Sequence, residues 1–315
     1  MSIGNRKTLT RAAILLLASA LAVAPGLAET PKGSDSYVDY SAPLRASGGP
    51  DAFGYTWFDQ DEAECNFSFN DISGTGTQLT FTASGTFPAD DDGGADVTLA
   101  APIDFYGTSV TDVVVSTNGY IAMGATLATE NGGDFSEDCP LPAAPDNTPA
   151  VPSRLSPYHN DLAGDGTGGT AWVEYFASCP RASEAGAEDC TIVQWENWGF
   201  FNGTVGYDLQ VVMYHQSGLF VYQYQDPNAQ LDASSTAIGL QNFDATDALQ
   251  IGCDTLGAIS DGSALCVYNP SCATPDCLAP SVPPTDIPTQ GPLSLLLLAL
   301  ALAAGGGIVL ARRRA

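Results

Sequence analysis

The chain has 315 residues, of which 36 are acidic and 10 are basic, so its formal net charge is −26 at pH 7. Six of the basic residues lie near the two ends, and the segment 29–286 carries only four of them together with all 36 acidic residues. Such a surface repels phosphate backbones, which excludes nucleic acid as a partner. It suits divalent cations, a cationic partner or a salty medium, although solubility by mutual repulsion is the simplest explanation.

The N-terminal region predicts an export signal. Three basic residues within the first 11 precede an apolar stretch at 12–24, and small residues follow it up to Ala28. This order is typical of a secretory signal peptide. We therefore expect residues 1–28 to be removed during export, with an uncleaved anchor as the alternative. Residues 29–50 are polar with Gly, Ser and Pro, and we predict a flexible lead there.

Short runs of alternating apolar and polar residues, separated by Gly, Asn, Asp and Ser, fill the segment 51–270. In "YDLQVVMYH" (207–215), for example, apolar residues at every second position share one face, while Asp208 and Gln210 share the other. Patterning of period two predicts a strand with one buried face. We therefore predict an all-β domain over 51–270, organised as an antiparallel β-sandwich.

Two hairpins and six further strands belong to this prediction. "LFVYQYQ" (219–225) pairs with the strand before it, and "DVVVSTNGYIAMG" (112–124) forms a second hairpin because Asn118–Gly119 supplies the positive φ angles of a tight turn. The other strand candidates are "FSFNDI" (67–72), "QLTFTA" (78–83), "AWVEYF" (171–176), "TIVQWENW" (191–198), "STAIGLQ" (235–241) and "ALCVYN" (264–269).

The C-terminal region predicts a membrane anchor on a stalk. Residues 271–291 are rich in Pro, Ser, Thr and Ala, cannot bury a core and tend to stay extended. The segment 292–311 contains no charged residue and is long enough to cross a hydrocarbon core of about 30 Å as a transmembrane helix. The basic tail at 312–315 is expected to stay on the cytoplasmic side. A buried core helix is the alternative for 292–311.

An Ile-Pro-Thr motif, one hydrophobic span and an arginine cluster follow one another at this end of the chain. The residues concerned are Ile287, Pro288 and Thr289 before the span and Arg312, Arg313 and Arg314 after it. In this order they resemble the IPTL-CTERM sorting signal of Gram-negative bacteria, although Gln290 stands where that family usually has Leu. The resemblance implies an exosortase-type processing enzyme as a partner, followed by display at the cell surface or release.

A second resemblance covers the chain from Tyr55 to Tyr268. It rests on "YTWFD", "FNDISGTGTQL", "IDFYGTSVTDVVVSTNGYIAMG", "SPYHNDLAGDGTGGTAWVEYF", "TIVQWENW" and "IGLQNFDATDALQ". These stretches are similar to a β-sandwich module of secreted bacterial proteins that is sometimes appended to subtilisin-like proteases. The resemblance implies an accessory or binding role. This role is an expectation, because a fold alone does not fix a function.

The cysteines are even in number, and in an exported chain they predict disulfides. They are Cys65, Cys139, Cys179, Cys190, Cys253, Cys266, Cys272 and Cys277. Eight thiols allow 105 pairings. Pairing of nearest neighbours predicts Cys179–Cys190, Cys253–Cys266 and Cys272–Cys277, which leaves Cys65–Cys139. Zinc is the alternative, but no CxxC spacing occurs and the chain has only two histidines.

Two acidic loops are candidates for calcium. "ADDDGGAD" contains Asp90 and Asp92, and "NDLAGDG" contains Asp161 and Asp165. Calcium takes six to eight oxygen ligands, which flexible acidic loops can provide. The pattern of an EF-hand loop is absent, and solvated turns with Asx hydrogen bonds are the alternative interpretation. No other cofactor is predicted.

Catalytic motifs are scarce, and we predict that the chain is not an enzyme. His159 and His215 are the only histidines, and neither G-x-S-x-G nor H-E-x-x-H occurs. We expect His159 to fill space in the fold and His215 to be exposed beside a turn. "GDGTGG" satisfies G-x-G-x-x-G, but a strand pattern follows it, which predicts a loop and no dinucleotide site. Among the aromatic residues, we expect Trp195 in the core and Trp198 to be the best candidate for exposure.

The function expected from these features is adhesion, or binding of a surface or polysaccharide ligand, by an exported protein anchored through its C-terminal helix. Two alternatives remain open. One is a secreted glycan hydrolase that uses paired carboxylates. The other is a structural component of a surface layer or matrix.

Overall fold

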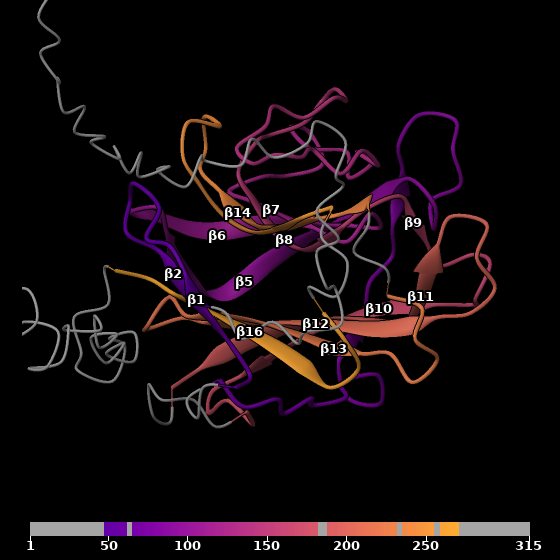
Figure 1. The fold of residues 1–315 in the computed structure, drawn as a ribbon. Helices are drawn as coiled ribbons and strands as arrows, with labels where there is room; N and C mark the ends of the chain where they lie inside the picture. Colours follow the sequence, from indigo (N-terminus) through magenta and orange to yellow (C-terminus); the bar gives the residue numbers. More distant parts are fainter. Residues whose placement is uncertain (1–46, 62–64, 182–187, 232–234, 255–258, 271–315) are drawn as a thin grey trace, which may run out of the picture. The chain divides into compact units, whose positions relative to one another are not determined.

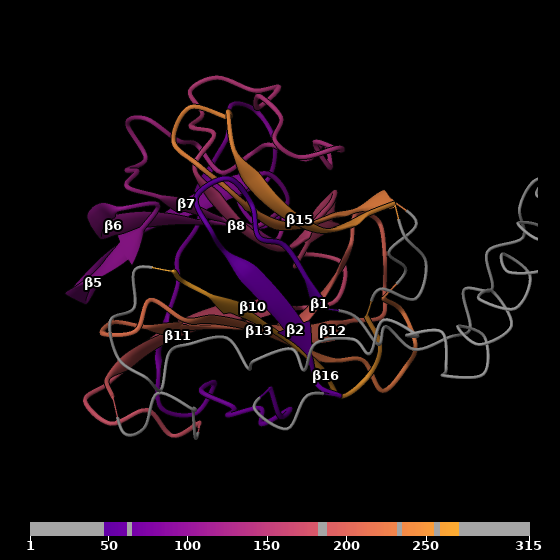
Figure 2. The same ribbon diagram turned by 60° about the vertical axis from the view of Figure 1, so that its left-hand side comes forward.

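The described part of the chain folds into two stacked antiparallel sheets (Figure 1). The computed structural model describes residues 47–61, 65–181, 188–231, 235–254 and 259–270. Within these ranges there are strands β1 to β16 and no α-helix, so the predicted all-β fold is confirmed. A turn of the molecule by 60° shows the same two layers facing each other (Figure 2).

The larger sheet, which we call sheet A, has nine strands. Their order is β1 (Ser47–Gly48), β2 (Thr56–Asp59), β16 (Ser263–Tyr268), β13 (Phe220–Gln225), β12 (Tyr207–Tyr214), β11 (Cys190–Phe200), β10 (Thr170–Phe176) and β3 (Thr77–Gln78), with β9 (Leu162–Ala163) paired to the end of β11. The predicted hairpin of "YDLQVVMYH" with "LFVYQYQ" is β12–β13 and is confirmed.

The smaller sheet, sheet B, has seven strands. Their order is β15 (Ala248–Cys253), β14 (Ala237–Gln241), β8 (Arg154–His159), β7 (Ile121–Met123), β6 (Thr108–Ser116), β5 (Gly93–Phe105) and β4 (Thr82–Ala83). The predicted hairpin at 112–124 is β6–β7. In its turn Gly119 adopts a φ of 72°, where a Cβ would strike the Tyr158 carbonyl, whereas Asn118 keeps a negative φ.

The core lies between the sheets and is built from their inward-facing side chains. Val113 and Leu155 of sheet B belong to the same buried cluster as Val193 and Val211 of sheet A, and all four are fully buried. Burial of such side chains contributes about 1.5–3 kcal/mol each. The alternation of apolar and polar residues that the sequence shows therefore results from packing between the layers.

Two tryptophans of β11 also join the layers by hydrogen bonds. Trp195 Nε1 donates to the Ser116 carbonyl (3.0 Å), and Trp198 Nε1 donates to the Thr117 carbonyl (2.8 Å). The core position of Trp195 is confirmed, but the expected exposure of Trp198 is wrong, since only 1% of it is exposed. Strict alternation would place residues three positions apart on opposite faces. The register shift between Trp195 and Trp198 turns both rings inward.

The outer face of sheet A is buried as well, contrary to the expectation of one buried face. Gln194, Gln210 and Gln223 are cross-strand neighbours on this face and are nearly inaccessible. Gln210 Nε2 donates to the Asn70 carbonyl (2.8 Å), and Gln194 Oε1 accepts from the Ile72 amide (2.9 Å). The segment "FSFNDI" is therefore not a strand. It lies across sheet A, and the three glutamine side chains satisfy its backbone.

Three disulfides lie within the described residues: Cys65–Cys266, Cys139–Cys253 and Cys179–Cys190. Only the prediction of Cys179–Cys190 is confirmed; Cys253–Cys266 and Cys65–Cys139 are wrong. Cys253 ends β15 in sheet B, whereas Cys266 lies in β16 of sheet A. Pairing of nearest neighbours in the sequence fails for Cys253 and Cys266 because the chain crosses from sheet B to sheet A between them.

Several predicted segments lie outside the described residues. They are the signal peptide 1–28, most of the lead 29–50, the stalk 271–291 with Ile287, Pro288 and Thr289, the span 292–311, the basic tail, and Cys272 and Cys277. Ser47–Gly48, at the end of the predicted lead, form β1. Of the described residues, none belongs to a helix that is long and apolar enough to cross a membrane.

We predict that Gln210→Met destabilises the protein by about 2–4 kcal/mol. The substitution leaves the buried carbonyl of Asn70 and the amide groups of Gln194 and Gln223 without this partner, and each lost buried hydrogen bond costs about 1–3 kcal/mol. Urea unfolding of the variant measures the change, with Gln78→Met on exposed β3 as the matched control. Equal stability of the two variants would show that the glutamine row contributes nothing.

Candidate functional site

Three carboxylates meet at one end of the stacked sheets. Asp91 and Asp92 immediately precede β5, and Asp161 lies between β8 and β9. One oxygen from each can be chosen so that all three lie within 4.8 Å of one another. We call these residues the acidic cluster. The two acidic loops that the sequence singled out separately are thus adjacent in the fold.

The sequence prediction named two of these three residues. Asp92 and Asp161 belong to the cluster, whereas Asp90 and Asp165 are exposed beside it. Asp90 contributes its backbone carbonyl, which accepts a hydrogen bond from the Gly164 amide (2.8 Å) and joins the two loops. Asp91 lies in the predicted loop but was not chosen as a ligand, because three consecutive aspartates give no periodic signal that says which of them face inward.

Asn118, at the β6–β7 turn, fixes the geometry between the two acidic loops. Its Nδ2 donates to Asp92 Oδ1 (2.9 Å), and its Oδ1 accepts from the Leu162 amide (2.9 Å). The amide groups of Asp91 and Asp92 both donate to the Pro88 carbonyl, at 3.2 and 3.1 Å, which forms the tight turn before β5. The cluster is therefore held by a buried side-chain amide and by backbone hydrogen bonds.

Burial and mutual repulsion dominate the electrostatics of the cluster. Burial, followed by the charges of Asp92 and Asp91, raises the pKa of Asp161 to about 6. Burial also raises the pKa of Asp91, with further contributions from Asp92 and Asp165. For Asp92, burial raises the pKa against the opposing hydrogen bond from Asn118. Carboxylates in such a setting can share a proton or hold a cation.

A second buried acidic group surrounds Arg154. The guanidinium lies 2.8 Å from Asp134 and 2.9 Å from Asp138. It also lies 3.8 Å from Glu130 and sits 4.2 Å from the ring centroid of Tyr120. Asp134 and Asp138 come close enough to His159 to suggest a metal site, but here the arginine already supplies the positive charge.

Both histidines are buried and engaged in contacts within the fold. His159 Nε2 lies 2.9 Å from the Asp134 carbonyl, and burial lowers its pKa to about 4. His215 Nε2 lies 2.9 Å from Thr191 Oγ1, and burial lowers its pKa too. The space-filling role expected of His159 is confirmed. The expected exposure of His215 is wrong, since only 8% of it is exposed.

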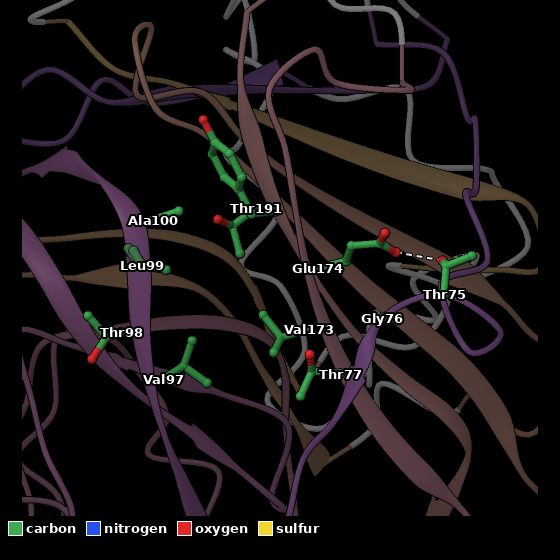
Figure 3. A pocket seen from close by; sticks show the side chains of 11 residues that line it. Thr75, Gly76, Thr77, Val97, Thr98, Leu99, Ala100, Val173, Glu174 and Thr191 are labelled. Atoms are coloured by element: carbon green, nitrogen blue, oxygen red, sulfur yellow. Dashed lines mark hydrogen bonds between the residues drawn. The ribbon is translucent and has the colours of Figure 1, made fainter.

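A groove of about 220 Å³ opens between β5 of sheet B and β10 of sheet A (Figure 3). Its lining consists of Thr75, Gly76, Thr77, Val97, Thr98, Leu99, Ala100, Val173, Glu174, Tyr175 and Thr191. Thr75 Oγ1 donates to Glu174 Oε2 (2.6 Å), as the dashed line in Figure 3 shows. Tyr175 is 43% exposed. This groove has no signal in the sequence, because its residues come from four separate segments.

Comparison with known proteins identifies the domain. A family model described as NIDO related matches residues 66–260, which is more than half of the chain. The chain belongs to the NIDO-related family. No curated protein and no solved structure matches the chain.

The NIDO-related region contains every strand from β3 to β15, together with the acidic cluster and the groove. It is a β-rich domain of an extracellular type. The three disulfides agree with this location, because disulfides persist in oxidising compartments.

We predict that the stability of Asp138→Asn, relative to that of the wild type, is higher at pH 8 than at pH 5. Burial and the nearby charge of Asp134 raise the pKa of Asp138 to about 7, whereas an unfolded chain has about 3.9. The folded state therefore binds the proton of Asp138 more tightly than the unfolded state does. The stability that this bound proton contributes is lost as the pH rises through 7.

Thermal melts of both proteins at pH 5 and pH 8 measure the effect. The melting temperature of Asp138→Asn relative to the wild type should be higher at pH 8. Asp244→Asn, in the exposed turn between β14 and β15, should show the same difference at both pH values. A pH-independent difference for Asp138→Asn would contradict the prediction.

Proposed function

We propose that this NIDO-related protein is a non-enzymatic binding module that attaches to carbohydrate at a cell surface or in an extracellular matrix. The groove between β5 and β10 is the observation that carries the proposal. A polysaccharide is a chain of rings with apolar faces and hydroxyl edges, and the groove offers partners for both.

The polar lining suits hydroxyl groups. Thr75 and Thr98 donate their hydroxyl protons to Glu174 and Asp112, so their oxygens can accept from a sugar, whereas Thr77 can donate and accept. The carboxylate of Glu174 accepts only. A sugar ring presents several hydroxyl groups that likewise donate and accept. The strongly negative chain favours a neutral or cationic sugar over an anionic one.

The apolar lining suits the face of a sugar ring. Val97, Leu99 and Val173 form the apolar part of the groove, and the ring of Tyr175 lies at its exposed side. Pockets for drug-sized ligands measure roughly 300–1,000 Å³. A groove of about 220 Å³ would hold one ring of a chain that continues over the surface.

The composition of the groove also favours binding over hydrolysis. Glycoside hydrolysis requires two carboxyl groups on either side of the scissile bond. Glu174 is the one carboxylate among the residues that line the groove, and it is engaged with Thr75. The predicted stalk and sorting tail would deliver such a module to the surface, with an exosortase-type enzyme as the processing partner.

We predict that Tyr175→Ala weakens polysaccharide binding about tenfold, which corresponds to ~1.4 kcal/mol. The exported full-length chain is incubated with insoluble cellulose, chitin and xylan and with a panel of immobilised neutral glycans. The bound fraction is then measured over a range of protein concentrations. Glu174→Gln should weaken binding to the same ligand as well.

The matched control is Phe87→Ala, which removes an aromatic ring that is 52% exposed and does not line the groove. This variant should bind like the wild type. If Tyr175→Ala binds polysaccharide as well as the wild type does, the groove is not the binding site. Reproducible release of soluble sugar by the wild type would instead support the glycan hydrolase.

A further inference from the structure

Within the described residues, the acidic cluster has no positively charged partner. Arg154 and Arg181 are the only lysine or arginine residues in the described ranges. Arg154 pairs with Glu130, Asp134 and Asp138. Arg181 Nη2 donates to the Asn66 carbonyl (2.8 Å) on the outer side of sheet A. Neither arginine neutralises the cluster.

Among the residues of the acidic cluster, Asp91 shows most clearly that a positive charge is needed beside the three carboxylates. Only 6% of the residue is exposed, and within the described part of the chain its carboxylate receives no hydrogen bond and forms no ion pair. One of its oxygens lies within 4.8 Å of an oxygen of Asp92 and of an oxygen of Asp161. Partial burial and the charges of neighbouring carboxylates disfavour its charged form and raise its pKa.

Most of the oxygen atoms of the cluster are also open. Among the described residues, Asp92 Oδ1 is the one carboxylate oxygen of the three side chains that accepts a hydrogen bond, from Asn118. The carboxylate of Asp161 accepts none, although its backbone groups are satisfied by Asn160 and Phe201. Open oxygens that converge from two fixed loops form a set of ligands ready for a cation.

We infer that Asp91, Asp92 and Asp161 bind a divalent cation, and that this cation is calcium. Calcium accepts carboxylates in one- or two-oxygen contact at 2.3–2.6 Å and completes its six to eight ligands with water. Magnesium requires a nearly ideal octahedron, and zinc prefers nitrogen and sulfur ligands. The site is independent of the groove between β5 and β10.

The cation would join parts of the fold that the sequence keeps apart. Asp91 and Asp92 lead into β5, whereas Asp161 lies between β8 and β9, about 70 residues further along the chain. A bound cation adds stability to the folded state according to its concentration relative to its dissociation constant. Extracellular modules bind calcium at roughly 10⁻⁴–10⁻³ M.

The first test is a calcium titration of the full-length chain after treatment with a chelator. The melting temperature should rise with dose, by about 5–10 °C at a hundredfold excess over the dissociation constant, and magnesium should give a much smaller rise. Terbium should replace calcium and emit on excitation of tryptophan, because the ring of Trp198 packs on Gly164 beside the cluster. Calcium should displace that emission.

Variants then assign the response to the cluster. Asp91→Asn and Asp161→Asn should lose the calcium shift and the terbium emission, while Asp244→Asn, which changes the charge equally at an exposed turn, should keep both. Without calcium, Asp91→Asn should be at least as stable as the wild type, because a buried charge has been removed; this shows that the variant folds.

Other outcomes overturn the inference. If neither calcium nor chelator changes the melting temperature of the wild type, the three carboxyl groups share protons instead of binding a cation. A full calcium response in Asp91→Asn or Asp161→Asn would place any cation elsewhere. Tyr175→Ala should keep the calcium response, so failure of the glycan proposal and failure of the cation site are distinguishable.

Discussion

Scarcity of positive charge is the constraint on which the described structure depends. Two arginines serve the entire described part of a chain that carries 36 acidic residues. Arg154 is 1% exposed and forms ion pairs with three carboxylates while it lies over the ring of Tyr120. Many buried carbonyls and carboxylates are therefore satisfied by neutral donors from glutamine, asparagine and tryptophan side chains. Asn118 and the two tryptophans of β11 are examples.

The sequence predicted the class of fold because apolar residues of period two report the face that packs between the layers. It failed on the outer face of sheet A for a physical reason. Gln194, Gln210 and Gln223 read as solvent-facing side chains, yet they bind the backbone of the segment 66–72. A buried amide and a solvated amide look the same in one sequence, since only the partner distinguishes them. The same segment was mistaken for a strand because its phenylalanines alternate.

The acidic cluster shows what a single sequence can and cannot give. Each loop was recognisable from its own composition, but their meeting depends on the sheet order and on Asn118, neither of which has a local signal. The disulfides follow the same rule. Cys179–Cys190 closes a short local loop, while Cys65–Cys266 and Cys139–Cys253 span 201 and 114 positions and follow the assignment of strands to layers. Local features were predicted, and features set by topology were not.

Strands β1, β2 and β16, where the described chain begins and ends, are neighbours in sheet A. A tensile load applied between residues 47 and 270 would therefore enter and leave through one layer, where the Cys65–Cys266 bridge ties the segment after β2 to β16. The strands of sheet B come from two segments between these ends, β4–β8 and β14–β15, and none of them lies beside β1, β2 or β16, so sheet B stays off the direct path of the force. Under such a load, the loops carried by sheet B would keep their shape.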